Sequence, residues 1–277
     1  MKNAAGKIVA LLAISSSAVF ADYYMALTDA YTVEIFNETG SLQSAVSLTG
    51  SETSSGTALI SMAYGDFLSS NPGKELIVLT GSNKVEFYAD PLTSGGSLSM
   101  LSARTLADGG RSISGITMVQ GSTDLAVAAM GTTPYGYTYD GTLAGTTLNR
   151  TIYSEMTGAK HVPYVSLAVG SDLNAAAGLD WAMLAADGYV EIFTKGASAS
   201  PRQTYFNPSA IEIAVTSDNL FALLNSNHTV SFRNFAGSTN VGKAAVTLDT
   251  ASNLVGFVTM AVPKMASISL IMISGAM

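Results

Sequence analysis

Five stretches of the chain repeat one order of apolar and polar positions. Each stretch has an acidic or amide residue, a run of apolar residues, a polar turn, and a second run that alternates apolar with polar residues. The second runs begin at Val33, Val85, Tyr137, Val190 and Val230, so their spacings are 52, 52, 53 and 40 residues. Alternation of this kind predicts half-buried β-strands, and a period of about 50 residues has room for four short strands in each unit.

A further set of five alternating stretches lies between these pairs of strands. They cover residues 60–64, 116–120, 165–169, 211–215 and 258–262. Large apolar residues fill their first and third positions, whereas the second positions hold Ser61, Thr117, Ser166, Glu212 and Thr259. Because alternate residues of a strand point to opposite faces, each strand has one bulky face and one small face. This pattern predicts crowded inner strands close to a common axis.

The two patterns together predict an all-β fold, a five-bladed β-propeller over residues 22–262. No apolar stripe with helical spacing competes with the strands. The first unit lacks an inner strand, whereas the inner-type strand at residues 258–262 is not followed by a second, third or outer strand. We therefore predict that the C-terminal strand becomes the innermost strand of the first blade and closes the ring, so that no strand edge is left exposed there. An open stack of sheets or a β-sandwich is the alternative.

The first 21 residues have the features of a secretory signal peptide. Lys2 and Lys7 precede an apolar run from Ile8 to Ile14, and small residues lead up to Ala21. The run is shorter than the roughly 18 to 20 apolar residues that a membrane-spanning helix needs. We therefore predict cleavage after Ala21 and a secreted or cell-surface protein.

Residues 263–277 are predicted to form a short apolar C-terminal tail. Thirteen uncharged residues follow Lys264, which are too few to span a bilayer comfortably. A sorting signal and an anchoring tail are its alternative roles.

The composition excludes several classes of protein. Apolar residues make up 48% of the chain and charged residues only 12%, which excludes a disordered protein. The net charge is −7 and no run of Lys or Arg occurs, so the electrostatic footprint of a nucleic-acid-binding protein is missing. The chain has no cysteine, which excludes disulfides, thiolate metal sites and cysteine nucleophiles.

Two segments resemble the repeats of FG-GAP/VCBS-type β-propellers. One covers residues 165–193 and contains Asp172, Asn174 and Asp180 before the Trp-Ala-Met-Leu strand. The other covers residues 60–88 and contains Gly65-Asp66-Phe67, followed by Glu75 at the start of a Leu-Ile-Val-Leu strand. The remaining three repeats share the period but not the loop between the first two strands.

The resemblance implies a calcium loop, because loops of this family bind calcium through oxygen atoms at alternating positions. Asp172, Asn174 and Asp180 match the first, third and ninth positions of the family pattern. Ala176 and Ala177 stand where the pattern has a further ligand and a glycine. The expected cofactor is therefore weakly bound calcium or none, and the alternative role of these side chains is to cap a tight turn through its backbone.

Catalytic motifs are scarce in the sequence. No nucleophile elbow, zinc-protease pair, phosphate-binding loop or dinucleotide fingerprint occurs, and only two histidines, His161 and His228, are present. Glu212 is the one carboxylic acid among the second positions of the inner strands, which makes it a weak candidate for a general acid with a raised pKa. An extracellular glycosidase or polysaccharide lyase is therefore one alternative function, although such enzymes usually need a second carboxylate.

The polar turns between the second and third strands of each unit are the predicted ligand-binding positions. Their representatives are Tyr31, Asn83, Tyr135, Asp187 and Asn227. Clustered side chains of these types bind sugar hydroxyls by hydrogen bonds and sugar rings by stacking, although turn chemistry also requires Asn, Asp and Gly. We therefore predict an exported, monomeric, non-catalytic protein whose partner is an extracellular carbohydrate or a surface protein. An adhesion or protein-interaction module is the second alternative.

Overall fold

The computed structural model describes residues 20–94, 96–106, 112–119, 125–130, 134–139, 147–148, 150–156, 158–171, 179–194, 201–239 and 241–263. Strands dominate this part of the chain, and its one helix, α1 (Ser51–Ser54), is a single turn. The predicted all-β class is therefore confirmed. No helix of the described residues is long and apolar enough to cross a membrane. Residues 1–19 of the predicted signal peptide and residues 264–277 of the predicted tail lie outside the described residues.

The strands recur in the predicted order of inner, second, third and outer strand. The inner strands are β4 (Leu59–Gly65), β8 (Ser112–Met118), β13 (Tyr164–Ser171), β17 (Ala210–Val215) and β21 (Leu254–Pro263). The second strands are β1 (Phe20–Thr28), β5 (Glu75–Thr80), β9 (Leu125–Met130), β14 (Leu179–Ala185) and β18 (Phe221–Asn225). The third strands are β2 (Thr32–Phe36), β6 (Lys84–Tyr88), β10 (Tyr135–Tyr139), β15 (Tyr189–Thr194) and β19 (Thr229–Arg233). The outer strands are β3 (Leu42–Thr49), β7 (Ser97–Leu106), β12 (Arg150–Glu155), β16 (Gln203–Phe206) and β20 (Val246–Thr247), with β11 (Thr147–Leu148) beside β7.

Hydrogen bonds join these strands into four sheets. Three sheets have four strands each, in the orders β12-β10-β9-β8, β13-β14-β15-β16 and β17-β18-β19-β20. The fourth has nine strands, in the order β21-β1-β2-β3-β7-β6-β5-β4 with β11 paired to β7. Its two halves meet where β3 runs parallel to β7, with Ser47 opposite Ser97 and Thr49 opposite Ser99. A five-bladed propeller is thus not confirmed by the hydrogen-bond pattern, because the first two predicted units share one sheet.

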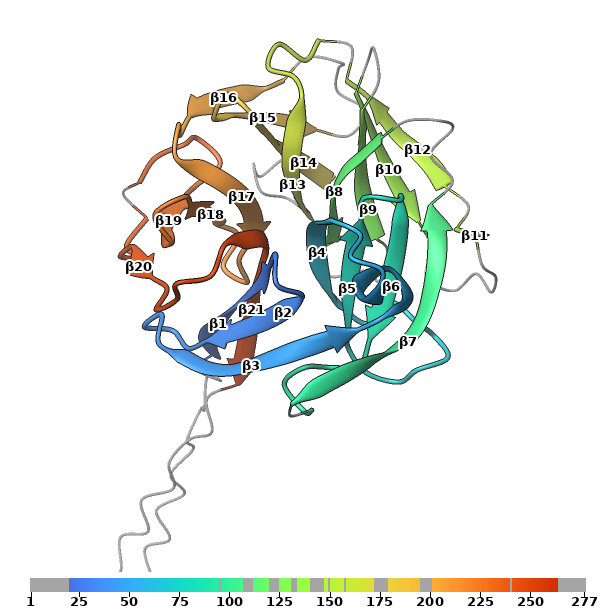
Figure 1. Ribbon diagram of the computed structural model, residues 1–277. Helices are drawn as coiled ribbons and strands as arrows, with labels where there is room; N and C mark the ends of the chain where they lie inside the picture. Colours follow the sequence, from blue (N-terminus) through green and yellow to red (C-terminus); the bar gives the residue numbers. More distant parts are fainter. Residues whose placement is uncertain are drawn as a thin grey trace, which may run out of the picture.

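The inner strands nevertheless lie next to one another in a cycle. Each packs against the next in the order β4, β8, β13, β17 and β21, and β21 packs against β4 again. Figure 1 shows these strands closest to the centre, with the remaining strands of each unit farther out. Residues far apart in sequence therefore meet around one axis.

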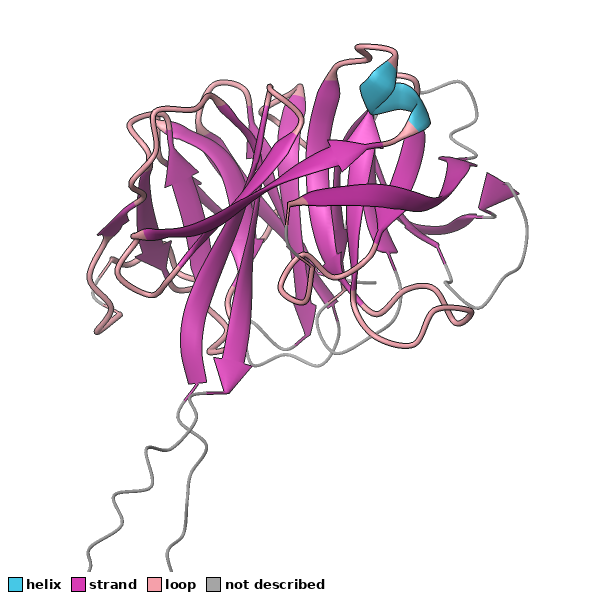
Figure 2. Cartoon of the chain, turned by 60° about the horizontal axis from the view of Figure 1, so that its bottom comes forward, coloured by secondary structure: helices cyan, strands magenta, loops and turns pink. Residues whose placement is uncertain are grey.

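The C-terminal strand pairs with the first strand of the chain, as predicted. β21 runs antiparallel to β1 from Phe20 opposite Pro263 to Thr28 opposite Leu254. The strand is longer than the predicted residues 258–262, since it begins at Leu254. Figure 2 shows the two strands side by side, so both ends of the described chain lie at one place. The pairing also begins two residues before Asp22, the predicted first residue after cleavage.

Each inner strand carries one extra residue at the same place, and this corrects the predicted alignment of the strands. The pairing with the second strand shifts at residues 60, 114, 165, 211 and 255. Such a shift is a β-bulge, in which two residues of one strand face one residue of its partner. The positions equivalent to Glu212 are therefore Ser61, Gly115, Ser166 and Gly256. Thr117 and Thr259, which the sequence placed in that set, lie two and three residues beyond it.

The hydrophobic core is divided into five clusters, and each cluster joins neighbouring units. Phe67 and Phe87 of the β4–β7 unit stack at 5.4 Å and pack with Ile116 of β8. The fully buried Trp181 of β14 packs with Ala126 of β9. Burial of each large apolar side chain stabilises the fold by about 1.5 to 3 kcal/mol, so the interfaces between units hold the cycle together.

Candidate functional site

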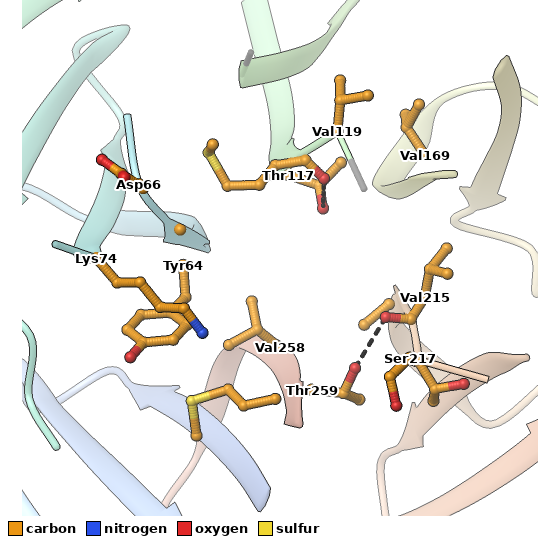
Figure 3. A pocket seen from close by; sticks show the side chains of 15 residues that line it. Tyr64, Asp66, Lys74, Thr117, Val119, Val169, Val215, Ser217, Val258 and Thr259 are labelled. Atoms are coloured by element: carbon orange, nitrogen blue, oxygen red, sulfur yellow. Dashed lines mark hydrogen bonds between the residues drawn. The ribbon is translucent and has the colours of Figure 1, made fainter. Parts of the chain in front are cut away.

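The inner strands surround a pocket of about 480 Å³ at one end of the axis. Small-molecule sites are concave and usually have volumes of about 300 to 1,000 Å³. Its walls are formed by Tyr64, Gly65, Asp66, Lys74, Thr117, Met118, Val119, Val169, Ala214, Val215, Thr216, Ser217, Val258, Thr259 and Met260. Figure 3 shows that all five inner strands contribute to this wall. The pocket is therefore the candidate binding site.

The loop between β4 and β5 brings two charged residues, Asp66 and Lys74, to the wall. Glu75 at the start of β5 is buried and fixes this loop. Its carboxylate accepts hydrogen bonds from the backbone N–H groups of Phe67 at 2.8 Å and Leu68 at 3.1 Å. It also accepts a bond from the Asn71 side-chain amide at 2.8 Å. A buried carboxylate that receives several N–H bonds orders the backbone around it, so the loop is preorganised.

The ring of Tyr64, near the end of β4, lies next to the ammonium of Lys74. The Tyr64 hydroxyl donates a hydrogen bond to Asp90 Oδ1 at 2.9 Å, which holds the ring in place. The Lys74 ammonium lies 5.1 Å from the centre of this ring, in a cation–π contact. Burial and the neighbouring Asp90 carboxylate raise the pKa of Tyr64 above its ordinary value, so its hydroxyl remains a donor at physiological pH.

The opposite wall of the pocket carries hydroxyl groups between apolar side chains. Thr259 Oγ1 donates to the carbonyl oxygen of Val215 at 2.9 Å, which ties β21 to β17. Thr216 Oγ1 donates to the Asp218 carboxylate and accepts a hydrogen bond from the Leu220 N–H at 3.0 Å. Ser217 is exposed and has no protein hydrogen-bond partner among the described residues. This wall therefore offers hydroxyl groups beside apolar surface to a bound molecule.

Glu212 lies deeper in the interface between β13 and β17. Its carboxyl is hydrogen-bonded to the Ser166 hydroxyl, which also accepts a bond from the Ile213 N–H at 3.2 Å. Burial, opposed by the bonds from Ser166 and the backbone, raises the pKa of Glu212 to about 8. The described residues that line the pocket do not include Glu212. The arrangement gives this carboxyl the structural role of joining two inner strands.

The predicted calcium ligands are only partly described. Asp172 and Asn174 lie outside the described residues, whereas Asp180 is buried at the start of β14 and accepts a hydrogen bond from Thr194 Oγ1 at 2.5 Å. Within the described residues no group of three or more His, Asp or Glu side chains is arranged to hold a metal ion. The calcium site therefore stays a prediction.

The five predicted ligand-binding turns lie at the end of the strands opposite the pocket. The last residue of each second strand, which precedes the turn, lies opposite the start of an inner strand. Thr28 pairs with Leu254 and Thr80 pairs with Leu59 in this way. The pocket is formed where inner strands such as β4, β8 and β17 end. The structure thus brings the turns to one end of the fold and separates them from the pocket.

Most of these turn residues make contacts within the protein. The Tyr31 hydroxyl donates to the Thr57 carbonyl at 3.4 Å, and Asn83 Oδ1 accepts from the Ile113 N–H at 3.2 Å. The Tyr135 ring stacks on Tyr137 with centroids 5.8 Å apart. These contacts tie the turns to the segments that enter the next inner strands or, for Tyr135, to its own strand.

Asp187 and Asn227 are the exposed members of the predicted set. Asp187 Oδ2 lies 2.8 Å from His161 Nδ1, and this bond lowers the pKa of the Asp187 carboxyl. The His161 ring stacks on Tyr189 at 3.8 Å. Asn227 Oδ1 accepts a hydrogen bond from Thr229 Oγ1 at 2.6 Å and so shapes its own turn.

Three buried carboxylates of the third strands were not predicted from the sequence, namely Glu34, Glu86 and Glu191. Glu191 accepts bonds from the backbone N–H groups of Lys160 and His161 and from the Tyr164 hydroxyl, at 3.2, 3.1 and 2.5 Å. Glu86 accepts bonds from the Glu52 N–H at 2.7 Å and Ser51 Oγ at 3.0 Å. Each carboxylate holds the segment that enters the inner strand of its unit. The signal was a glutamate at the same position of three repeats, directly after Val33, Val85 and Val190.

Comparison with known proteins gives no family. No protein-family profile and no curated protein matches the chain. Several solved structures resemble it at low identity. A protein of unknown function from Bacteroides caccae is 10% identical, with a TM-score of 0.43 over 82% of this chain and 72% of that one. BBS1N, solved in complex with ARL6DN, is 12% identical, with a TM-score of 0.44 over 81% of this chain and 63% of that one.

Raptor from Chaetomium thermophilum is 10% identical, with a TM-score of 0.46 over 81% of this chain. This chain spans 63% of BBS1N and 19% of Raptor, so both proteins are considerably longer than the matched part. TM-scores of this size assign neither a family nor a function to the chain.

Proposed function

We propose that the protein is an exported, non-catalytic, five-bladed β-propeller that binds carbohydrate in the pocket at the end of its axis. The observation that carries this proposal is the pocket itself, which combines hydroxyl groups, apolar side chains and one tyrosine within about 480 Å³. Sugars present hydroxyl groups at their edges and C–H groups on their ring faces, so a wall of mixed character suits them.

Three repeated features support the propeller. The inner strands form a cycle, each carries a β-bulge at the same place, and each of the five hydrophobic clusters joins neighbouring units. One backbone hydrogen bond is also repeated in every unit. An N–H group at or next to the end of the outer strand donates to a carbonyl oxygen in the turn between the second and third strands. The donor and acceptor pairs, donor first, are Leu48 and Tyr31, Leu106 and Asn83, Met156 and Pro134, Asn207 and Gly188, and Leu248 and His228. The parallel pairing of β3 with β7 is then a contact between the outer strands of adjacent blades.

The resemblance of two repeats to FG-GAP/VCBS-type propellers supports the same architecture, and the features of residues 1–21 support export. We assign no reaction to Glu212, because its carboxyl is buried against Ser166 and the described pocket wall lies farther along the strands. Non-catalytic binding is therefore the function that the geometry favours.

The test is an assay of the chain from Asp22 onward against a panel of immobilised polysaccharides. Retention of the protein and release of new reducing ends are measured together. We expect retention without release, and release of sugar ends would instead indicate a glycosidase or lyase. Absence of retention on every polysaccharide would contradict carbohydrate binding and favour a protein partner.

A matched pair of variants locates the site. Ser217→Trp places a large ring at the pocket wall, whereas Ser226→Trp places the same ring on an exposed turn at the opposite end. We expect loss of retention for Ser217→Trp and none for Ser226→Trp. The reverse result would place the ligand at the turns that carry Asp187 and Asn227.

A further inference from the structure

Lys74 and Asp66 are the charged residues of the pocket wall, and they are placed differently. In Figure 3 the Lys74 ammonium is directed toward the interior of the pocket, whereas the Asp66 carboxylate points away from it. The charged group of the wall that is directed into the pocket is therefore a cation, although the whole chain has a net charge of −7.

Among the described residues the Lys74 ammonium has no counter-ion. In the described part of the chain Lys74 forms no ion pair, whereas Lys84 pairs with Glu52 at 2.6 Å and Lys243 lies 3.7 Å from Asp218. Its partner in the structure is the face of the Tyr64 ring. An ammonium has three N–H donors, and one that contacts an aromatic face still has donors directed away from the ring, which can bind an anion.

The ring beneath this ammonium and the loop that carries it are ordered before any ligand arrives, although the Lys74 side chain itself is exposed. Asp90 holds the Tyr64 ring through the hydroxyl, and the buried Glu75, the neighbour of Lys74 in sequence, holds the loop. Because the Tyr64 ring and the loop backbone are already ordered, only the Lys74 side chain loses entropy when an anion binds there. The wall is therefore organised to receive a negative charge at one place.

The rest of the wall suits the uncharged part of the same ligand. Thr117 and Ser217 provide hydroxyl groups on other strands and loops, and Ser217 lies across the pocket from Lys74 in Figure 3. Val119, Val169 and Val258 provide apolar surface between them. A molecule that fits has one carboxylate at one end and several hydroxyl groups on a compact body.

From this arrangement we propose that the pocket binds uronic acids, with the sugar carboxylate on Lys74 and the ring hydroxyls on the opposite wall. This inference rests on the proposed carbohydrate-binding function and names its ligand class. It assigns Lys74 as the residue that determines specificity for acidic over neutral sugars. The Asp66 carboxylate, which points away, does not oppose the ligand.

The test compares each uronate with its neutral parent hexose on the chain from Asp22 onward. Glucuronate, galacturonate and mannuronate are titrated against glucose, galactose and mannose, and the dissociation constants are measured by NMR shift changes. We expect at least one uronate to bind about fivefold more tightly than its parent at low ionic strength, as for an exposed ion pair. This preference should disappear at high salt, because exposed charges are screened.

Three variants separate a role in specificity from a role in folding. Lys74→Met should abolish the preference and leave the affinity for the neutral sugar unchanged, and Lys74→Arg should keep the preference. Lys243→Met removes a lysine that also lies over an aromatic ring, at 4.7 Å from the centre of Phe232, but outside the pocket wall, and should change nothing.

Equal affinities for a uronate and its parent, where the parent binds, would overturn this inference and leave the proposed function standing. Equal weakening of both ligands in Lys74→Met would also overturn it, because it would indicate a general effect on the pocket. Failure of every sugar, acidic and neutral, would contradict the proposed function as well as this inference.

Discussion

The Ser166 hydroxyl is hydrogen-bonded to the buried carboxyl of Glu212 across the interface between β13 and β17. Glu212 is 4% exposed, and its place in the repeat is taken by Ser or Gly in the other four units. A carboxyl in such a position is stabilised in its neutral form, because burial disfavours the charge. The interface therefore depends on the protonation of one side chain.

This dependence predicts a decline of stability with pH. The pKa of Glu212 is about 8 in the folded protein, whereas a glutamate has an ordinary pKa of 4.5, which applies to the unfolded chain. As the pH rises, the unfolded chain therefore loses this proton at a lower pH than the folded protein does. The free energy of unfolding should therefore fall by about 1.4 kcal/mol per pH unit across most of that window. The loss should be complete above pH 8. In Glu212→Gln, which stays neutral and keeps a hydrogen-bonding side chain, this slope should be absent.

Urea unfolding of both proteins at several pH values between 5 and 9 measures this slope. Glu38→Gln, a change at an exposed glutamate, serves as the control and should keep the slope of the unmodified protein. An identical slope in Glu212→Gln would show that other groups cause the pH dependence.

The buried third-strand glutamates should differ in importance according to their bonds. Glu191→Ala leaves the N–H groups of Lys160 and His161 and the Tyr164 hydroxyl without their acceptor. In Glu34→Ala only the bond from Ser252 Oγ, at 2.7 Å, is lost, and Glu34 Oε2 has no hydrogen-bond partner among the described residues. An abandoned buried donor costs about 1 to 3 kcal/mol and a part-buried donor less. Glu191→Ala abandons the buried Tyr164 hydroxyl and two part-buried N–H groups, so we expect it to destabilise by about 3 kcal/mol, and Glu34→Ala, which abandons one part-buried hydroxyl, by about 1 kcal/mol.

Chemical unfolding of both variants under one set of conditions tests this order. A larger loss in Glu34→Ala than in Glu191→Ala would contradict the anchoring role assigned to the third-strand carboxylates.

The strands and their order were predictable from the sequence, because alternation and the repeated period survive at the level of single residues. The register of the inner strands was not. An extra residue such as Ser114 or Val255 has no signature of its own, and it moves every later residue to the opposite face. The alternating stretches at residues 116–120 and 258–262 begin farther along their strands than those of the other units, and Thr117 and Thr259 were therefore assigned to the level of Glu212, where the structure has Gly115 and Gly256.

The pocket was not predictable for a related reason. Lys74 and Ser217 are 143 residues apart in sequence and belong to different loops, and only the cyclic packing of the inner strands brings them to one wall. The polar turns were visible in the sequence because Asn and Asp are required there by the backbone. Asn83 and His228 have φ angles of 56° and 63°, which these residue types tolerate better than most.

Gly256 should tolerate no larger residue, because β21 approaches β4 closely at this point. A Cβ atom at Gly256 would lie 3.0 Å from Met62 Cγ and 3.1 Å from the Met62 backbone nitrogen. Gly256→Val should therefore destabilise the protein by about 1 to 3 kcal/mol through overpacking.

Gly73→Val is the control. At this position a Cβ atom would meet no other atom within 4 Å, but φ is 117°, so the variant would report the cost of backbone strain alone. Thermal melting measures both, and a Gly256→Val protein as stable as the unmodified one would exclude a tight β21–β4 contact.

Closure by β21 predicts that the whole cycle depends on the C-terminal strand. Removal of residues 254–277 would expose Tyr24 and Leu27 of β1 and Met62 of β4, which are all buried in the intact protein. It would also leave the backbone of β1 as an open edge, which promotes aggregation. We expect this truncated chain to lose its cooperative thermal transition, whereas a chain that ends at Pro263 should keep it. Circular dichroism of the two chains during heating distinguishes these outcomes, and similar melting of both would mean that the remaining strands form a stable fold without β21.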